Sequence, residues 1–349
     1  MSNYWQWFNT TGSVWWHDSG NPDEISAAIQ KGAQGVTTNP VLTYKTFIES
    51  PDFWKDRLAA VPKNLPSELH AEELLKIVVT YAASELLPIY ESTDHKQGYA
   101  LGQLNPNNAG DAEEMLKQAY RIKKWGPNVM IKLPATKAGI EVLEELASSG
   151  TSICASVNVS VAQAMAVAEA FEKGYNKAIA NGVKPGVCII VQQIGRIEDY
   201  MRLMNGENGK ILSQREIDLS GVAITKKTIS LVKKQGYHGI VMPAGLRTPL
   251  QLAELAGANV IFTLHPRFQK LVEQANMPRE IVCDKPVDSA AIERLLKIEE
   301  FRRMYDENAL FSEEFIKLGC VQKVLSHFLE SGWARLETYM TDVPSEHWT

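Results

Sequence analysis

Hydrophobic positions along the chain fall in short runs rich in valine and isoleucine, and helical patterns separate these runs. Eight runs have the length of a strand, at residues 14–18, 35–39, 99–104, 129–133, 153–158, 187–194, 239–243 and 260–264. The runs are nearly continuous in apolar residues, which is typical of strands covered on both faces. This pattern predicts a parallel sheet of the α/β class.

The segments between the runs carry signals of helix ends. Asn21 precedes a proline and two acidic residues, and Thr248 precedes Pro249 in the same way. Asp111 precedes a stripe of apolar residues that stops at Gly126. A short polar cap and a proline at the first helical position are typical of helix N-termini, so we expect a helix after each of these positions.

Eight strand–helix pairs within residues 14–276 predict a (β/α)8 TIM barrel. A doubly wound sheet also alternates strands and helices, but no GxGxxG motif follows the first strand. We expect a single domain over residues 1–349, with a helical insertion at 65–90 and a helical C-terminal extension at 277–349. The functional site of such a barrel lies at the carboxyl ends of its strands.

Composition narrows the class of protein. The 349 residues carry a net charge of −5 and are 45% hydrophobic, which suits a large core and gives no sign of a nucleic-acid or membrane surface. The four cysteines lie far apart without a CxxC pair, so neither a metal site nor a disulfide is expected. Without a signal-peptide pattern or an apolar run of membrane-spanning length, we expect a cytoplasmic protein. A homo-oligomer remains one option for its assembly.

Lys132 interrupts an otherwise apolar strand pattern that Pro134 closes. Burying an ammonium group costs free energy unless the charge is paired or the pKa of the amine falls. Lys132 is therefore either a structural residue paired with a carboxylate or a neutral nucleophile that forms a Schiff base. The spacing alone leaves both interpretations open.

Other polar residues also fall at the predicted strand ends, where they would face one cavity. Amides and hydroxyls bind sugar hydroxyl groups, and paired arginines hold a dianion, so this set suits a phosphorylated polyol. Arginines at a barrel rim also form ion pairs, however, and a rim histidine is often purely structural. The candidates are Asp18, Thr38, Asn39, Gln103, Lys132, Ser156, Asn158, Gln193, Arg196, Gly245, Arg247 and His265.

Several motifs resemble the transaldolase family. They are TTNP at 37–40, IKLPAT at 131–136 followed by Gly-Ile, AQA at 162–164, GRI at 195–197 and LAG at 255–257. The resemblance covers roughly residues 14–276. It implies a (β/α)8 barrel in carbohydrate metabolism, with sugar phosphates as substrates and no metal or organic cofactor.

The resemblance also implies roles for single residues. Lys132 resembles the lysine that forms the Schiff base, and Asp18 resembles the acid/base that exchanges a proton with the substrate hydroxyl. Asn39 resembles the side chain that holds a hydroxyl of the dihydroxyacetone unit. Arg196 and Arg247 resemble the arginines that bind phosphate.

Five positions depart from the family pattern, and one of them is Val191, which replaces a small residue on the sixth predicted strand. Transaldolases usually carry a glutamate and a threonine where this chain has Gln103 and Ser156. An amide orients water but takes no proton at neutral pH. Fructose-6-phosphate aldolases share the glutamine but carry a tyrosine where transaldolases carry phenylalanine, and this chain has Gln193. Gly245 replaces a serine near the phosphate.

These residues favour a transaldolase that moves dihydroxyacetone from a ketose phosphate to an aldose phosphate, as in the pentose phosphate pathway. A free aldolase of the fructose-6-phosphate aldolase type is one alternative. Another is an enzyme for a different anionic sugar, such as a sulfosugar, because Gly245 lacks a hydroxyl donor for the phosphate. A non-catalytic sugar-phosphate-binding relative is the hypothesis of another class. Retention of Lys132 and Asp18 argues against a pure binder.

Overall fold

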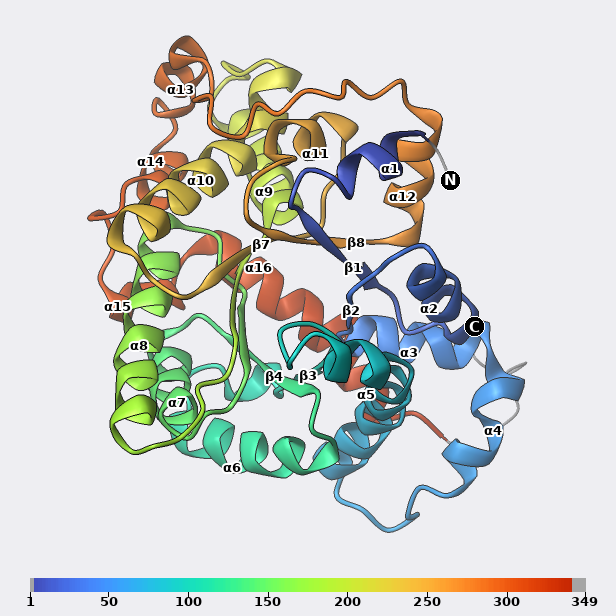
Figure 1. Ribbon diagram of the computed structural model, residues 1–349. Helices are drawn as coiled ribbons and strands as arrows, with labels where there is room; N and C mark the ends of the chain where they lie inside the picture. Colours follow the sequence, from blue (N-terminus) through green and yellow to red (C-terminus); the bar gives the residue numbers. More distant parts are fainter. Residues whose placement is uncertain (1–2, 341–349) are drawn as a thin grey trace.

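The computed structural model describes residues 3–340, which form a nearly closed barrel of eight parallel strands surrounded by helices (Figure 1). The predicted (β/α)8 barrel is confirmed, and each strand ends within two residues of its predicted boundary. The strands are β1 (Val14–Asp18), β2 (Gly35–Thr37), β3 (Tyr99–Gln103), β4 (Val129–Pro134), β5 (Ile153–Ser156), β6 (Cys188–Gln192), β7 (Ile240–Pro243) and β8 (Ile261–Leu264).

Each strand pairs with its neighbours in chain order, and β1 pairs with β8. The ring closes between β7 and β8 through a single bridge that joins Ala244 to Thr263. This pair of strands is therefore the seam of the barrel. The seam lies beside the cavity described below, because both bridge residues line it.

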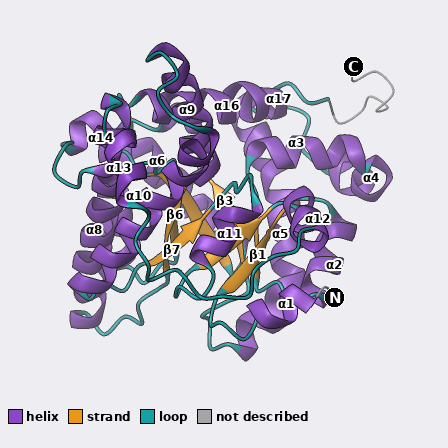
Figure 2. Cartoon of the chain, turned by 90° about the horizontal axis from the view of Figure 1, so that it is seen from above, coloured by secondary structure: helices purple, strands orange, loops and turns teal. Residues whose placement is uncertain are grey.

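Helices cover the barrel from outside (Figure 2). Eight of them follow the strands in turn. Two of these helices begin at a predicted cap. Asn21 accepts hydrogen bonds from the backbone of Asp23 and Glu24 at the start of α2, and Asp111 accepts one from the backbone of Glu114 at the start of α6. The eight are α2 (Pro22–Gln30), α5 (Ser67–Ser92), α6 (Ala112–Ile122), α7 (Lys137–Ser148), α8 (Val161–Ala180), α10 (Gln214–Gln235), α11 (Pro249–Leu255) and α12 (Pro266–Gln274).

Residues 65–90, predicted as an insertion, belong to the ring of helices. They lie mostly in α5, which packs against β2 and β3 and connects these two strands. The helical character of this segment is as predicted, and the structure places it in the connection between β2 and β3. The additional helices in this connection are α3 (Pro40–Glu49) and α4 (Pro51–Ala59).

Further short elements extend this framework. Helix α1 (Asn3–Phe8) lies near the start of the chain, and α9 (Ile194–Glu207) precedes α10. Two short 3₁₀ helices are η1 (Pro106–Asn108) and η2 (Lys123–Trp125). The C-terminal region is helical, as predicted. It contains α13 (Ser289–Leu295), α14 (Glu299–Tyr305), α15 (Ser312–Phe315), α16 (Gly319–Phe328), the π-helix η3 (Leu329–Trp333) and α17 (Ala334–Glu337).

The inside of the barrel is filled by apolar side chains that include Trp16, Leu101, Met130 and Met242. Successive residues of a strand point to opposite sides, so Trp15 packs outward against the helices while Trp16 points inward. The inward-facing side chains form an apolar layer below the carboxyl ends of the strands.

The C-terminal helices cover the carboxyl end of the barrel on one side. Helix α16 contacts α9, and the following η3 contacts α3 on the other side of the barrel mouth. Gly332 makes this close approach feasible, since a Cβ at that position would lie 2.7 Å from the backbone nitrogen of Val41. The C-terminal region is thus fastened over the strand ends.

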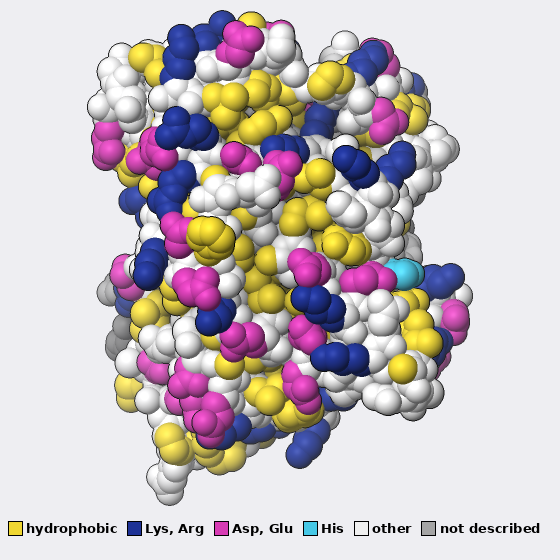
Figure 3. All heavy atoms as spheres, turned by 90° about the vertical axis from the view of Figure 1, so that its left-hand side faces the viewer, with side chains coloured by type: hydrophobic (Ala, Val, Ile, Leu, Met, Phe, Trp, Pro, Cys, Tyr) yellow, Lys and Arg dark blue, Asp and Glu magenta, His cyan; other side chains and the backbone are white. Residues whose placement is uncertain are grey.

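The outer face formed by α7, α8, α14 and α15 carries interspersed acidic and basic side chains with small apolar areas between them (Figure 3). Within residues 3–340, the structure contains no helix that combines the length and apolar character needed to cross a membrane.

Replacing Gly35 with alanine is expected to destabilise the barrel. A methyl group there would lie 2.5 Å from the buried indole of Trp16. Overpacking of this kind lowers the free energy of unfolding by about 1–3 kcal/mol, which denaturant titration measures. Gly206→Ala in α9 is the matched control, because its Cβ meets open space. An unchanged midpoint for Gly35→Ala would contradict the packing described.

Candidate active site

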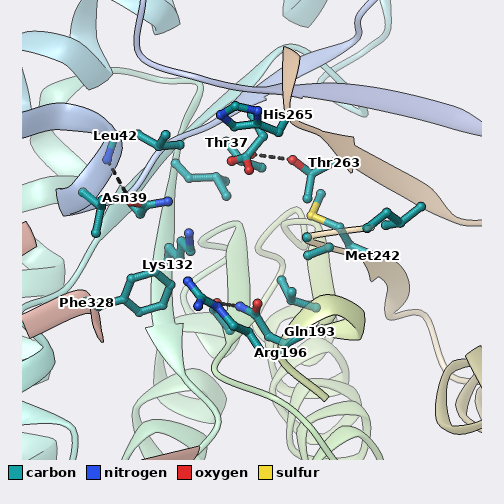
Figure 4. A pocket seen from close by; sticks show the side chains of 18 of the residues that line it. Thr37, Asn39, Leu42, Lys132, Gln193, Arg196, Met242, Thr263, His265 and Phe328 are labelled. Atoms are coloured by element: carbon teal, nitrogen blue, oxygen red, sulfur yellow. Dashed lines mark hydrogen bonds between the residues drawn. The ribbon is translucent and has the colours of Figure 1, made fainter. Parts of the chain in front are cut away.

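A cavity of about 210 Å³ opens at the carboxyl ends of the strands. In Figure 4, Thr37, Thr263 and His265 lie on one side, Gln193 and Arg196 lie on the opposite side, and Lys132 lies beside Asn39 and Phe328. Eight of the residues predicted from the sequence line it together: Asp18, Asn39, Lys132, Ser156, Gln193, Arg196, Gly245 and Arg247.

Lys132 projects from β4 into this cavity and is only 6% exposed. Its Nζ donates a hydrogen bond to the carbonyl of Thr38 at 2.9 Å and lies 5.7 Å from the centre of the Phe328 ring. Within residues 3–340, no carboxylate oxygen comes within the 4.0 Å of an ion pair. The interpretation of Lys132 as an ion-paired structural residue is therefore not supported.

Burial is the main influence on the amine. It lowers the pKa of Lys132, and the nearby Cys154 and Asp18 oppose this shift more weakly. Cys154 is itself fully enclosed, and burial raises the pKa of its thiol to about 12, so it supplies no thiolate at neutral pH. The surroundings of Lys132 thus favour the neutral amine, which is the nucleophilic form.

Asp18 ends β1 and faces the same cavity. Its Oδ1 accepts a hydrogen bond of 2.6 Å from the hydroxyl of Thr37, which lies 2.5 Å from the hydroxyl of Thr263. His17 points the other way, as strand alternation predicts, and its Nδ1 contacts Gln269 of α12. Asp18 is thus the carboxylate that β1 presents to the cavity.

The loop after β2 places two predicted residues differently. Asn39 caps α3 by accepting a hydrogen bond from the backbone of Leu42, which leaves its amide NH₂ free to donate into the cavity. The hydroxyl of Thr38 instead donates to the carbonyl of Leu101, and the side chain is fully buried outside the cavity. In this structure only the backbone carbonyl of Thr38 reaches the amine, and the role of Thr38 in substrate binding stays a prediction.

A second, smaller cavity adjoins Lys132. It is lined by Gln103, Ser156 and Phe328 among others, and its volume of about 10 Å³ suits about one water molecule. Gln103 Oε1 is buried without a hydrogen-bond partner among the described residues. Ser156 Oγ accepts a hydrogen bond from Gln193 Nε2 at 3.2 Å. Gln103 therefore lies beside the amine but faces the smaller cavity.

Asn158 lines neither of these cavities, although it was predicted to bind substrate. Val157 adopts a left-handed backbone conformation, with φ of 55°. This residue ends the strand alternation after Ser156, so the side chain of Asn158 is fully buried elsewhere. The prediction assumed a strand two residues longer than the observed one.

Arg196 and Arg247 approach the cavity from α9 and from the loop after β7. Burial lowers the pKa of Arg196, and the positive charge of Arg247 adds to this effect. Arg247 Nη2 donates to Asp199 at 2.8 Å, so Arg247 forms a rim ion pair and also lines the cavity. Gly195 allows this arrangement, since a Cβ there would lie 1.9 Å from the carbonyl of Gly245.

Among the lining residues that were not predicted to act in the cavity are Thr263, His327 and Phe328. His265, interpreted as a structural rim residue, also lines the cavity, and its Nδ1 accepts a hydrogen bond from the backbone of Arg267. His327 and Phe328 come from α16. No sequence signal marked them, because they stand at no strand end and belong to no motif.

The four cysteines are unpaired, and Cys154, Cys188 and Cys320 are buried. In the part of the chain that the structure describes, no three side chains of histidine, cysteine, aspartate or glutamate are placed to hold a metal ion. The chemistry available in the cavity is therefore that of an amine, a carboxylate, amides, hydroxyls and guanidinium groups.

Comparisons with known proteins agree with this geometry. Residues 15–317 match the family model described as transaldolase/fructose-6-phosphate aldolase. A transaldolase of Neisseria gonorrhoeae is 33% identical over 162 residues, which cover 46% of this chain and 46% of that protein. Transaldolase 2 of Nostoc sp. is 27% identical over 270 residues, which cover 75% of this chain and 64% of that protein. The chain thus spans about half the length of the first of these relatives.

Reductive methylation with formaldehyde and cyanoborohydride at pH 7 is expected to modify Lys132 before Lys117. Only the neutral amine reacts; burial lowers the pKa of Lys132, whereas hydrogen bonds with Glu113 and Glu114 raise the pKa of Lys117. The neutral fraction of Lys132 is therefore the larger one at pH 7. Peptide mass mapping measures both sites. If Lys132 is methylated only when the pH is high enough for Lys117 to react as well, the lowered pKa of Lys132 is contradicted.

Proposed function

The chain belongs to the transaldolase/fructose-6-phosphate aldolase family, and we propose that it cleaves a ketose phosphate through a Schiff base on Lys132 and transfers the dihydroxyacetone unit to an aldose phosphate. One observation carries this proposal: a buried amine faces a cavity without a carboxylate ion-pair partner among the described residues. An ion-paired ammonium group could not attack a carbonyl carbon.

In the proposed reaction, neutral Lys132 attacks the ketone carbon to give a carbinolamine, which loses water to form an iminium ion. The C3–C4 bond then breaks, and its electron pair moves to the positive nitrogen. Asp18 takes the proton of the C4 hydroxyl as the aldose phosphate leaves. The resulting enamine attacks the carbonyl carbon of an acceptor aldose phosphate, and Asp18 returns the proton to the new hydroxyl. Water then adds to the iminium carbon, and cleavage of the C–N bond releases the product ketose phosphate and restores the amine of Lys132.

Different sides of the cavity bind different parts of the substrate in this proposal. Asn39 offers its amide NH₂ to a hydroxyl of the dihydroxyacetone unit, close to the amine. Arg196 and Arg247 line the cavity farther along, where they suit the phosphate of the substrate. A ketose phosphate in this arrangement extends from the amine to the arginines, with its C4 hydroxyl toward Asp18.

The smaller cavity suits the water that the dehydration step releases. Gln103 Oε1 is an unpaired acceptor for it, and the Ser156 hydroxyl can donate, because its oxygen already accepts from Gln193. An amide orients this water but removes no proton from it. Gln103 therefore bears on how fast water releases the adduct, a step that both transfer and free release of dihydroxyacetone require.

A free aldolase of the fructose-6-phosphate aldolase type is the second candidate, because that group also carries a glutamine at the position of Gln103. Time courses with fructose 6-phosphate, with and without erythrose 4-phosphate, separate the two. Release of glyceraldehyde 3-phosphate that depends on the acceptor supports transfer. Equal rates without the acceptor would exclude it.

Borohydride added together with a ketose phosphate is expected to fix a three-carbon unit on Lys132. The reagent reduces the imine to a stable secondary amine, and intact mass with peptide mapping locates it. Lys226 is the internal control, since its side chain is only 8% exposed but is ion-paired with Glu254 and lines no part of this cavity. A Lys132 peptide without added mass, while the enzyme turns over, would refute the Schiff base.

Asp18→Asn is expected to separate adduct formation from bond cleavage. The variant keeps the amine of Lys132 and still forms a borohydride-reducible adduct with dihydroxyacetone, which needs no C4 proton transfer. Cleavage of the ketose phosphate falls by roughly 10²- to 10⁴-fold, the usual contribution of a general base. Full cleavage activity in this variant would assign the base to another residue.

A further inference from the structure

Helix α16 adds a third group to the arginine side of the cavity. His327 and Phe328 stand at its end and both line the cavity. The same helix packs against α9, which carries Arg196 in its first turn. Phe328 lies over the amine of Lys132, and His327 shares the cavity with the two arginines.

The net charge of the side chains on the arginine side of the cavity is smaller than the two positive charges that would neutralise a dianion. Arg196 and Arg247 are both positive, but Asp199 pairs with Arg247 at 2.8 Å. These three groups leave one net positive charge beside the cavity. A proton on His327 would supply the second positive charge that a dianionic group calls for.

His327 is free to take this role. Its ring is half-buried and forms no hydrogen bond within residues 3–340. Burial lowers the pKa of His327, and the charges of Arg196 and Arg247 lower it further, while Glu330 opposes them. The ring is therefore neutral in the empty cavity at neutral pH. The charged groups on α16 and on the elements around it are Arg196, Glu198, Asp199, Arg202, Glu207, Arg247, Lys317, Lys323 and Glu330.

We propose that His327 is a third ligand for the anionic group of the substrate, and that it takes up a proton when a dianion binds between it, Arg196 and Arg247. The imidazolium N–H then replaces the hydroxyl donor that Gly245 lacks. The identity of the anion as the phosphate of a sugar rests on the proposed function, whereas the binding of a dianion does not.

The sign of the pH dependence follows from this proton uptake. A dianion favours protonated His327, so affinity rises as the pH falls from 8 to 6, by up to about tenfold per pH unit for one proton. Sulfate is the suitable probe, because it stays a dianion over this range, whereas a phosphate ester takes up a proton near pH 6. His265 also titrates and lines the cavity, but it lies across from Arg196 in Figure 4.

Calorimetry with sulfate at pH 6, 7 and 8 tests the proposal on the full chain. The unmodified protein is expected to bind sulfate more tightly at lower pH and to take up a proton, seen as a heat that depends on the buffer. His327→Gln keeps a hydrogen-bond donor but gains no proton, so it should bind more weakly at pH 6 and lose the pH dependence. Arg196→Met should bind sulfate poorly at every pH, which places the measured site in this cavity.

His238→Gln is the matched control. This histidine is half-exposed, contacts Glu172 and lines no part of the cavity, so its variant should behave as the unmodified protein does. In kinetics, His327→Gln should raise KM for a phosphorylated donor and leave adduct formation with uncharged dihydroxyacetone unchanged. Identical sulfate affinity and pH dependence in His327→Gln and the unmodified protein would overturn the proposal.

The two proposals fail separately. If no adduct forms on Lys132 but sulfate binding depends on His327, the Schiff-base function is wrong and the anion site stands. If the adduct forms and His327→Gln changes nothing, the function stands and His327 is no anion ligand.

Discussion

An amine enclosed without a negative partner is the constraint on which the site depends. The Nζ of Lys132 meets a carbonyl, an aromatic ring and apolar side chains, and none of these compensates a full positive charge. Water is largely absent at 6% exposure, so the ammonium form is penalised by desolvation. The barrel maintains this state because its interior layer is apolar and its polar groups begin only at the carboxyl ends of the strands.

The remaining groups lie on two sides of that amine. Strands β1, β2 and β8 supply the carboxylate of Asp18 with its hydroxyl partners, whereas β6, β7, α9 and α16 supply donors and positive charge. The separation matters electrostatically, because an aspartate next to the amine would raise the pKa of Lys132 and abolish its nucleophilic form. Asp199 holds Arg247 at the rim, which moderates the positive charge without placing a carboxylate near Lys132.

The sequence predicted a functional residue well where that residue lies inside a regular strand. The eight strands and the lysine inside one of them were predictable, because an ammonium group in an apolar run contradicts its surroundings. The side chains of Thr38 and Asn158 lie outside the cavity. Their direction could not be predicted, since it depends on where a strand ends and on the left-handed backbone conformation of Val157. His327 and Phe328 lay beyond prediction. Their place in the cavity results from packing between α16 and α9, which are distant in the chain.

The parts of the active site are synthesised at different times, because they lie far apart in the chain. The last barrel strand ends at Leu264, whereas the aromatic ring over the nucleophile belongs to Phe328. Chains leave the ribosome from their N-terminus at about 5–20 residues per second. A nascent chain therefore contains every strand of the barrel seconds before it contains the ring that covers the amine.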